Sequence, residues 1–281
     1  MIVLLGVLPL WCNRKLGALL GYLAWLSGAK AAKLCLDNIA SCFPELTGTQ
    51  QRQLAKHSMI ETGKTAGETA SIWRQPHRRI RRYINAVDGL DKLQRNFDRG
   101  RGVLLLLPHL GNWEVLGQFV PQHFPYTAMY QPADDPSMDV VMRKGRLREG
   151  MKLAPANRQG VAQALKALRA GEIVTVLPDQ VPKPGSGEAT EFFGQPAMTM
   201  TLVHKLIQHT GCAVMMGVAE RDNNGFHLYF TEPHSDIYHA DCNSSLRGLN
   251  RSIEQCVNKI PQQYQWEYNR FKLSKNHPTA S

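Results

Sequence analysis

The pattern of apolar and polar positions divides the chain into two parts of different character. Residues 1 to about 45 are largely apolar, and Pro44 and Gly48 mark a break after them. The stretch 50–73 then places its apolar positions on one side of a helix. Further along, short apolar runs alternate with amphipathic stretches. We therefore predict an apolar helical segment over residues 1–45 and a larger catalytic domain over residues 46–281.

The larger part has the alternation of strands and helices that is typical of an α/β fold. The run GVLLLL at 102–107 is apolar at every position, as in a strand that is buried on both faces. The expected strands are 102–107, 127–131, 172–177, 212–220 and 226–232. The expected helices are 113–120, 137–150, 158–171, 200–211 and 244–260. Together they predict a mixed, mostly parallel sheet covered by helices.

Two of the predicted strands end in the same way. GVLLLLPH leads into His109, and EIVTVLPD leads into Asp179. In open α/β sheets, ligands bind at the carboxyl ends of the strands. We therefore expect both side chains at one edge of the sheet, within a candidate site.

His109 is the candidate general base. It precedes the helix 113–120, whose positive dipole end favours the neutral imidazole that a base needs. Glu114 falls in the first turn, and we expect its carboxylate to reach back, fix the imidazole tautomer and stabilise the imidazolium. No GxSxG motif and no nearby Ser or Cys accompanies the pair, so the base would activate a hydroxyl or water of the substrate. A surface His/Glu pair is the alternative.

The apolar N-terminal segment favours membrane association. Neither MIVLLGVLPLW nor LGALLGYLAWLSGA has the roughly 18 to 20 residues of a spanning helix. Trp11, Tyr22 and Trp25 are residues that suit the interface of a bilayer. We expect an interfacial or re-entrant anchor here, and a buried helical hairpin is the alternative.

The charge of the chain favours an acidic partner without naming it. The formal net charge is +10, and residues 74–101 hold nine Arg or Lys against three Asp. Such a balance suits an anionic membrane, an acidic protein or nucleic acid. Because the basic stretch follows the apolar segment, we favour anionic lipid headgroups. The six Cys are scattered without zinc spacing, which predicts free thiols and no metal site.

Five stretches between about residues 34 and 272 carry a resemblance to a known family. They are PHLGNWE, YQPADDPSMDVVMRKGRLREG, NRQGVAQALKALRAGE, PDQVPKPGSGEATEFFGQPAMTMT and YQWEYNRFK. In this order they resemble the bacterial lipid A late acyltransferases, the lauroyl and myristoyl transferases of the lysophospholipid acyltransferase superfamily. The signature of that superfamily is a His followed five positions later by an acidic residue.

The resemblance implies a reaction and a location. The enzyme would move a fatty acyl chain from the thioester of acyl carrier protein to a hydroxyl of a 3-hydroxyacyl chain on a lipid A precursor. It would act at the cytoplasmic face of the inner membrane, without a cofactor and without a nucleic-acid partner. It would bind acyl carrier protein, the precursor and the anionic membrane. Single-spanning and monotopic attachment both remain open.

The resemblance also assigns roles to residues. His109 matches the base of the family and Glu114 its acidic partner. Substrate binding is implied for four further residues: Arg146, Arg158, Asp179 and Gln180. The guanidinium groups suit the phosphates of the acceptor. The Asp side chain would pair with one of these Arg residues or hold a loop.

Two motifs near the C-terminus leave alternatives open. In EFFGQPAMT, Phe192 and Phe193 either shape an acyl channel or pack in the core. In QWEYNRFK, Arg270 and Lys272 either contact phosphate or pack their stems on the surface.

Other functions also remain open. The acceptor could be a lysophospholipid or an aminolipid, although PDQVP in place of a Pro-Glu-Gly-Thr-Arg block disfavours the glycerol-phosphate branch. A non-catalytic protein that binds anionic lipid or nucleic acid through residues 74–101 is the remote alternative.

Overall fold

The computed structural model describes residues 8–147 and 150–272 and contains a seven-stranded sheet as its centre. In spatial order the strands are β1 (Ile84–Asp88), β9 (Phe226–Thr231), β8 (Ala213–Arg221), β2 (Val103–Leu106), β5 (Ile173–Val176), β3 (Tyr126–Tyr130) and β4 (Lys152–Pro155). The five strands from β8 to β4 are parallel, whereas β9 is antiparallel to β8 and pairs in parallel with β1. The predicted mixed, mostly parallel sheet is confirmed.

Helices surround this sheet, and a separate hairpin flanks it. The helices are α2 (Leu10–Leu26), α3 (Lys30–Cys42), α4 (Gly48–Arg74), α5 (His77–Arg81), α6 (Leu90–Asp98), α7 (Trp113–Phe119), α8 (Pro136–Arg146), α9 (Arg158–Arg169), α10 (Leu202–Thr210) and α11 (Cys242–Val257). Strands β6 (Gly187–Phe192) and β7 (Gln195–Met200) form the antiparallel hairpin. Side chains cap several helix starts; for example, the Asn157 side chain accepts a hydrogen bond from the Gly160 amide at 2.9 Å.

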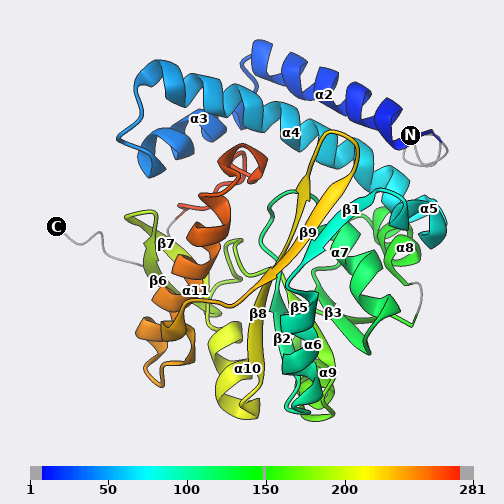
Figure 1. Ribbon diagram of the computed structural model, residues 1–281. Coiled ribbons are helices and arrows are strands. Elements are labelled where there is room, and N and C mark those ends of the chain that lie inside the picture. Colours follow the sequence, from blue (N-terminus) through cyan, green and yellow to red (C-terminus); the bar gives the residue numbers. More distant parts are fainter. Residues whose placement is uncertain (1–7, 148–149, 273–281) are drawn as a thin grey trace.

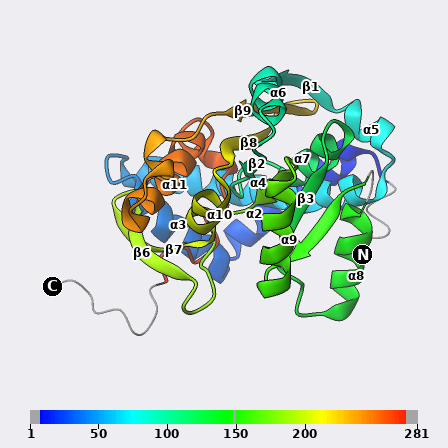
Figure 2. The same ribbon diagram turned by 90° about the horizontal axis from the view of Figure 1, so that it is seen from below.

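Strand β2 is buried on both faces, as its apolar run predicts. Leu104 and Leu106 belong to a core shared with α9, α10 and α11, whereas Val103 and Leu105 belong to a core shared with α6 and α7. Figure 2 shows α6 on one side of the strands and α10 on the other. Each face of the sheet therefore has its own layer of helices. The candidate site lies at an edge of the sheet, between these two layers.

Helices α2 and α4 lie side by side across the top of the molecule in Figure 1. Their backbones approach at glycines: a Cβ on Gly17 would lie 2.1 Å from the Gly63 carbonyl oxygen, and one on Gly21 would lie 2.2 Å from the Met59 oxygen. Arg14 of α2 also forms an ion pair with Glu68 of α4. The described part of segment 1–45 is thus packed onto the rest of the chain, and a division at residue 45 stays a prediction.

Helix α2 leaves apolar side chains on the molecular surface. Trp11, Leu19, Leu20, Leu23 and Leu26 are each about half exposed. In the described ranges 8–147 and 150–272, no helix is both long enough and apolar enough to cross a bilayer.

Candidate active site

The loop after β2 holds His109 in a fixed place. The Gly111 amide donates to the Gln263 carbonyl at 3.0 Å, and the Gln265 amide donates to the His109 carbonyl at 3.1 Å. Gly111 has φ 64°, and a Cβ there would lie 2.0 Å from the Ala219 carbonyl oxygen. Only glycine fits this position without strain. The sheet and the C-terminal segment therefore clamp the loop from two sides.

Asp179 contacts His109 directly, because β2 and β5 are neighbouring parallel strands. The His109 backbone amide donates to Asp179 Oδ2 at 2.7 Å, and the His109 Nδ1 atom lies 2.7 Å from Oδ1. Burial raises the pKa of this carboxyl group, but the charge and hydrogen bonds of His109 outweigh that effect and lower it below its usual range. An ionised carboxylate only accepts hydrogen bonds, so when the imidazole is neutral Nδ1 carries its proton and Nε2 has the free lone pair of a base.

Glu114 has different partners from the one that the sequence predicts. Its carboxylate accepts hydrogen bonds from the Trp73 indole at 2.8 Å and from Arg146 Nε at 3.1 Å, and it forms an ion pair with the same guanidinium. Trp113 interacts with the Glu114 carboxylate, and its ring packs edge-on against the His109 imidazole at 4.6 Å between centroids. The predicted contact between Glu114 and His109 is therefore wrong. The carboxylate that contacts the His109 imidazole is that of Asp179.

The pair formed by Glu114 and Arg146 is buried and ionised. Burial raises the pKa of Glu114, but the Arg146 charge and hydrogen bonds outweigh it, so the pKa lies below its usual value. The Arg146 side chain is only 19% exposed. Its guanidinium also lies over the Trp73 ring, 5.8 Å from the centroid. Arg146 is thus engaged within the protein, and the pair fixes both Trp73 and the start of α7.

The remaining residues predicted for substrate binding lie around the same edge of the sheet. Arg158 is the first residue of α9, is exposed, and follows β4, which stands two strands from β5. The Gln180 amide donates to the Gln265 side-chain oxygen at 3.2 Å. The structure therefore brings His109, Asp179 and Gln180 together and leaves Arg158 at the periphery.

A cavity of about 250 Å³ opens beside His109. One wall comes from α4, and the others come from the loop after β2, the start of α7, α8 and the C-terminal segment. The residues that line it are Thr62, Thr65, Ala66, Thr69, Ala70, Trp73, His109, Gly111, Trp113, Met138, Gln263, Gln265 and Glu267. His109 and Glu267 are the two titratable side chains among them. The cavity gives the imidazole a mainly apolar compartment next to bulk solvent.

Sequence reasoning missed the C-terminal side of the site. Tyr264 is buried, and its hydroxyl interacts with the Asp179 carboxylate, which together with burial raises the pKa of the phenol well above its usual value. Glu267 faces the cavity and accepts a hydrogen bond from Thr62 at 3.0 Å. Both residues occur in a quoted motif, but no local pattern says that this segment closes over a loop about 150 residues earlier.

The two C-terminal motifs are packed inside the protein. Phe192 is fully buried, and the rings of Phe193 and Trp266 contact each other at 5.7 Å between centroids. This confirms the interpretation that the EFFGQP stretch packs in the core. Arg270 is 3% exposed, and it donates to the Met198 carbonyl and to Thr199 Oγ1. The interpretation as surface packing is wrong for Arg270, which is buried, whereas Lys272 is exposed; phosphate contact by either side chain stays a prediction.

We expect the replacement Glu267→Gln to stabilise the protein at alkaline pH. Burial raises the pKa of Glu267 above 4.5, so ionisation disfavours the folded state progressively as pH rises through 4.5 and then through the folded pKa. Glutamine keeps the hydrogen bond from Thr62 without that charge. We expect a melting temperature about 2 °C higher at pH 8 and unchanged at pH 4. Thermal denaturation across this pH range measures it, with exposed Glu188→Gln as the matched control; equal gains at both pH values would contradict the account.

Comparison with known proteins identifies the family of this chain. The profile of the bacterial lipid A biosynthesis acyltransferase family matches residues 1–273. The chain is 28% identical to the lipid A biosynthesis lauroyltransferase of Escherichia coli (strain K12) over 92% of this chain and 84% of that protein. It is 29% identical to the palmitoleoyltransferase of the same organism, over 95% and 89%. The myristoyltransferase is 23% identical, over 92% and 80%.

The family match covers both the sheet that carries His109 and the C-terminal segment that closes over it. The relatives named above differ in the acyl group that their names give, but all are acyltransferases of lipid A biosynthesis. The resemblance inferred from the five motifs is confirmed. This chain belongs to the bacterial lipid A biosynthesis acyltransferase family, and it is an acyltransferase.

Proposed function

We propose that this acyltransferase moves a fatty acyl chain from the thioester of acyl carrier protein to a hydroxyl of a 3-hydroxyacyl chain on a lipid A precursor. The observation that carries the proposal is the His109–Asp179 pair at the wall of an apolar cavity. A base with a free Nε2 and a compartment for hydrocarbon are what transfer of an acyl chain to a hydroxyl requires.

The proposed reaction proceeds by direct attack. His109 Nε2 takes the proton of the acceptor hydroxyl as the oxygen attacks the thioester carbonyl carbon. The carbon–sulfur bond of the tetrahedral intermediate then breaks, and the leaving thiolate receives the proton from the imidazolium. Asp179 stabilises the imidazolium between these steps. Among the described residues, the cavity lining contains no Ser or Cys, which supports transfer without an acyl-enzyme.

Glu114 has a positioning role in this proposal. It holds the two indoles of the cavity wall, through a hydrogen bond from Trp73 and an interaction with Trp113. Trp113 in turn packs against the imidazole. Glu114 and Arg146 therefore act on His109 through the tryptophans, and the phosphates of the acceptor are assigned to exposed Arg158, with Gln180 near the reacting groups.

We further propose attachment to the cytoplasmic face of the inner membrane through α2. Its half-exposed leucines and Trp11 suit the boundary between headgroups and acyl chains. Lys15 lies over the Trp11 ring, 5.2 Å from the centroid, and four exposed Arg residues follow on and after α5: Arg78, Arg79, Arg81 and Arg82. Cations of this kind attract anionic headgroups, and the net charge of +10 also favours an acidic carrier protein.

Acceptor profiling tests the proposal. The purified enzyme is incubated with lauroyl acyl carrier protein and either a tetraacylated lipid A precursor or a lysophospholipid, and the products are analysed by mass spectrometry. We expect one acyl group to be added to the precursor and little change in the lysophospholipid. Acylation of the lysophospholipid alone would contradict the proposed acceptor, and transfer from free fatty acid or coenzyme A thioester in preference to the carrier would contradict the proposed donor.

A further inference from the structure

Asp179 has a charge that its direct neighbours do not balance. The residue is 2% exposed, and its carboxylate contacts the His109 imidazole and the Tyr264 hydroxyl. In the resting site that general-base catalysis requires, both partners are neutral, so the attraction that a protonated His109 exerts on Asp179 is absent there. A buried carboxylate without a cation tends to take up a proton. The ionised form of Asp179 therefore needs a positive charge from elsewhere in the protein.

Arg270 supplies a buried charge next to this group. Its guanidinium donates to the Met198 carbonyl and, at 3.1 Å, to Thr199 Oγ1, and it lies over the Phe192 ring at 5.2 Å. All of these partners are uncharged. Among the described residues, no carboxylate forms a direct ion pair with Arg270. The charge of Arg270 is thus held in place by neutral groups and remains available to act through space.

The packing connects Arg270 to Asp179. The Phe192 ring beneath the guanidinium lies 6.3 Å from the Tyr264 ring, and Tyr264 in turn interacts with Asp179. The attraction between the two charges lowers the pKa of Asp179 and opposes the effect of burial on Arg270. Both groups are almost fully buried, so this attraction is stronger than it would be at the surface.

We propose that Arg270 is a positioning residue that keeps Asp179 ionised and thereby keeps the proton on His109 Nδ1. If Asp179 were protonated, its hydroxyl would donate to Nδ1, and the imidazole would carry its proton on Nε2 instead. An Nε2–H group cannot accept the proton of the acceptor hydroxyl. Arg270 would thus set the tautomer of the base without touching it. This inference rests on the proposed role of His109 as the base.

The two readouts that follow from this inference are the pH profile and the tautomer. The titratable and charged groups around Asp179 are His109 and Tyr264 in contact and Arg270 behind them. Glu267 faces His109 across the cavity, and Cys42 contributes to the raised pKa of Tyr264. Removal of the Arg270 charge raises the pKa of Asp179, because the ionised form loses its counter-charge. Activity would then require a higher pH.

The matched variants are Arg270→Met, which keeps a long apolar side chain without charge, and Arg270→Lys, which keeps the charge. For Arg270→Met we expect kcat at pH 7 to fall about tenfold, with KM nearly unchanged, because the acidic limb of the kcat profile moves upward until its midpoint lies about one unit above pH 7. Arg270→Lys should retain the pH profile of the wild type even if it is less stable. Equal losses in both variants, without movement of the limb, would show a structural role and overturn the inference.

A double replacement and a measurement without turnover complete the test. In the Asp179→Asn background, the further change Arg270→Met should cause no additional loss of kcat, because there is no carboxylate left to keep ionised; an additive loss would overturn the inference.

The ¹⁵N chemical shifts of the His109 ring report the tautomer directly. The wild type should have its proton on Nδ1 and Arg270→Met on Nε2 at pH 7, and an unchanged tautomer would again overturn it. Since the spectrum needs no substrate, its outcome is independent of the proposed donor and acceptor.

Discussion

Replacing His109 with alanine is expected to lower kcat for acyl transfer by about 10² to 10⁴-fold, while KM for donor and acceptor changes little. The variant loses the Nε2 lone pair that deprotonates the acceptor hydroxyl, but the walls of the cavity remain. The measurement is the initial rate of acyl transfer at saturating concentrations of both substrates.

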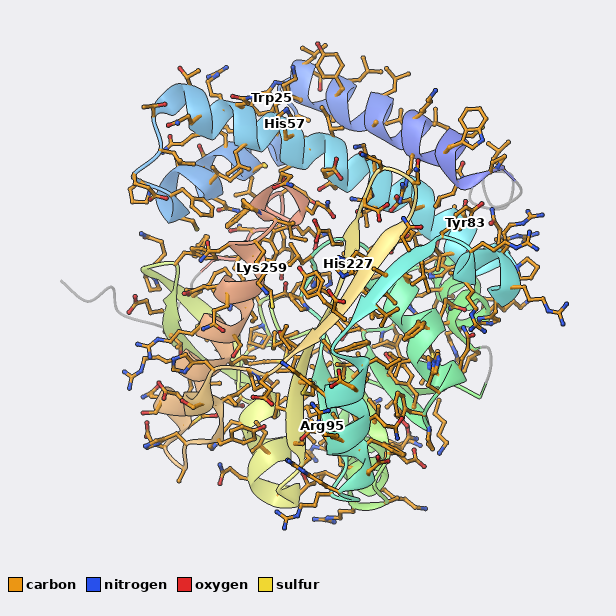
Figure 3. The ribbon with its side chains drawn as sticks, viewed as in Figure 1. Trp25, His57, Tyr83, Arg95, His227 and Lys259 are labelled. Carbon is orange, nitrogen blue, oxygen red and sulfur yellow. The ribbon has the colours of Figure 1, made fainter. Side chains whose placement is uncertain are left out.

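A matched control is provided by His57→Ala. His57 is exposed on α4, and Figure 3 shows it in the upper helical layer. It should keep the kcat of the wild type. Melting temperatures of both variants separate loss of chemistry from loss of folding. A His109→Ala enzyme that is folded and as fast as the wild type would show that another group removes the proton.

Replacing Glu114 with alanine is expected to have the largest effect on stability. It would leave the Arg146 guanidinium, 19% exposed, without its carboxylate and the two indoles without their acceptor. Removal of one partner from a buried ion pair typically lowers the free energy of unfolding by about 3 to 5 kcal/mol. Because the pKa of Glu114 is lowered in the folded state, its stabilisation is present above pH 4.5 and is lost as pH falls through the folded pKa. The difference between variant and wild type should therefore shrink in acid.

Denaturant unfolding of a mutant cycle measures this effect. The variants are Glu114→Ala, Arg146→Met and the two changes combined. We expect the double variant to be more stable than the sum of the single losses predicts, by at least about 1 kcal/mol, because no unpaired charge is left behind. Strictly additive losses would mean that the two groups do not interact in solution.

The sequence predicted the frame of the site because that frame depends on local patterns. An apolar run such as 102–107 has few structures open to it other than a buried strand, and the structure has β2 there. The matching ends of β2 and β5 then placed His109 and Asp179 at one edge. Parallel pairing of neighbouring strands was enough for this prediction, and it needed no knowledge of side-chain directions.

The partner of His109 could not be predicted in the same way. Glu114 is five residues from His109 and Asp179 is 70 residues away, so spacing along the chain favoured the wrong carboxylate. The direction of a side chain at the first turn of a helix decides the matter, and there Trp113 faces the imidazole while Glu114 faces Arg146. Arg146 in turn comes from α8, and its position depends on tertiary packing.

The N-terminal segment shows the same difference between local and long-range information. Its composition predicted apolar helices, and α2 and α3 lie there. Small residues such as Gly17 and Gly21 gave no sign in the hydropathy pattern that α2 would lie in backbone contact with α4. A close approach of this kind is possible because glycine has no side chain. A hydropathy pattern does not contain this information.

The central claim is that Asp179, and not Glu114, holds His109 in the tautomer that acts as the base. The most direct test is kcat for acyl transfer by Asp179→Asn, a replacement that keeps the shape of the side chain and removes its charge. The account predicts a fall of about 10² to 10⁴-fold with a folded protein and nearly unchanged KM, since the amide can donate to Nδ1 and move the proton to Nε2. A folded Asp179→Asn enzyme with the kcat of the wild type would contradict it.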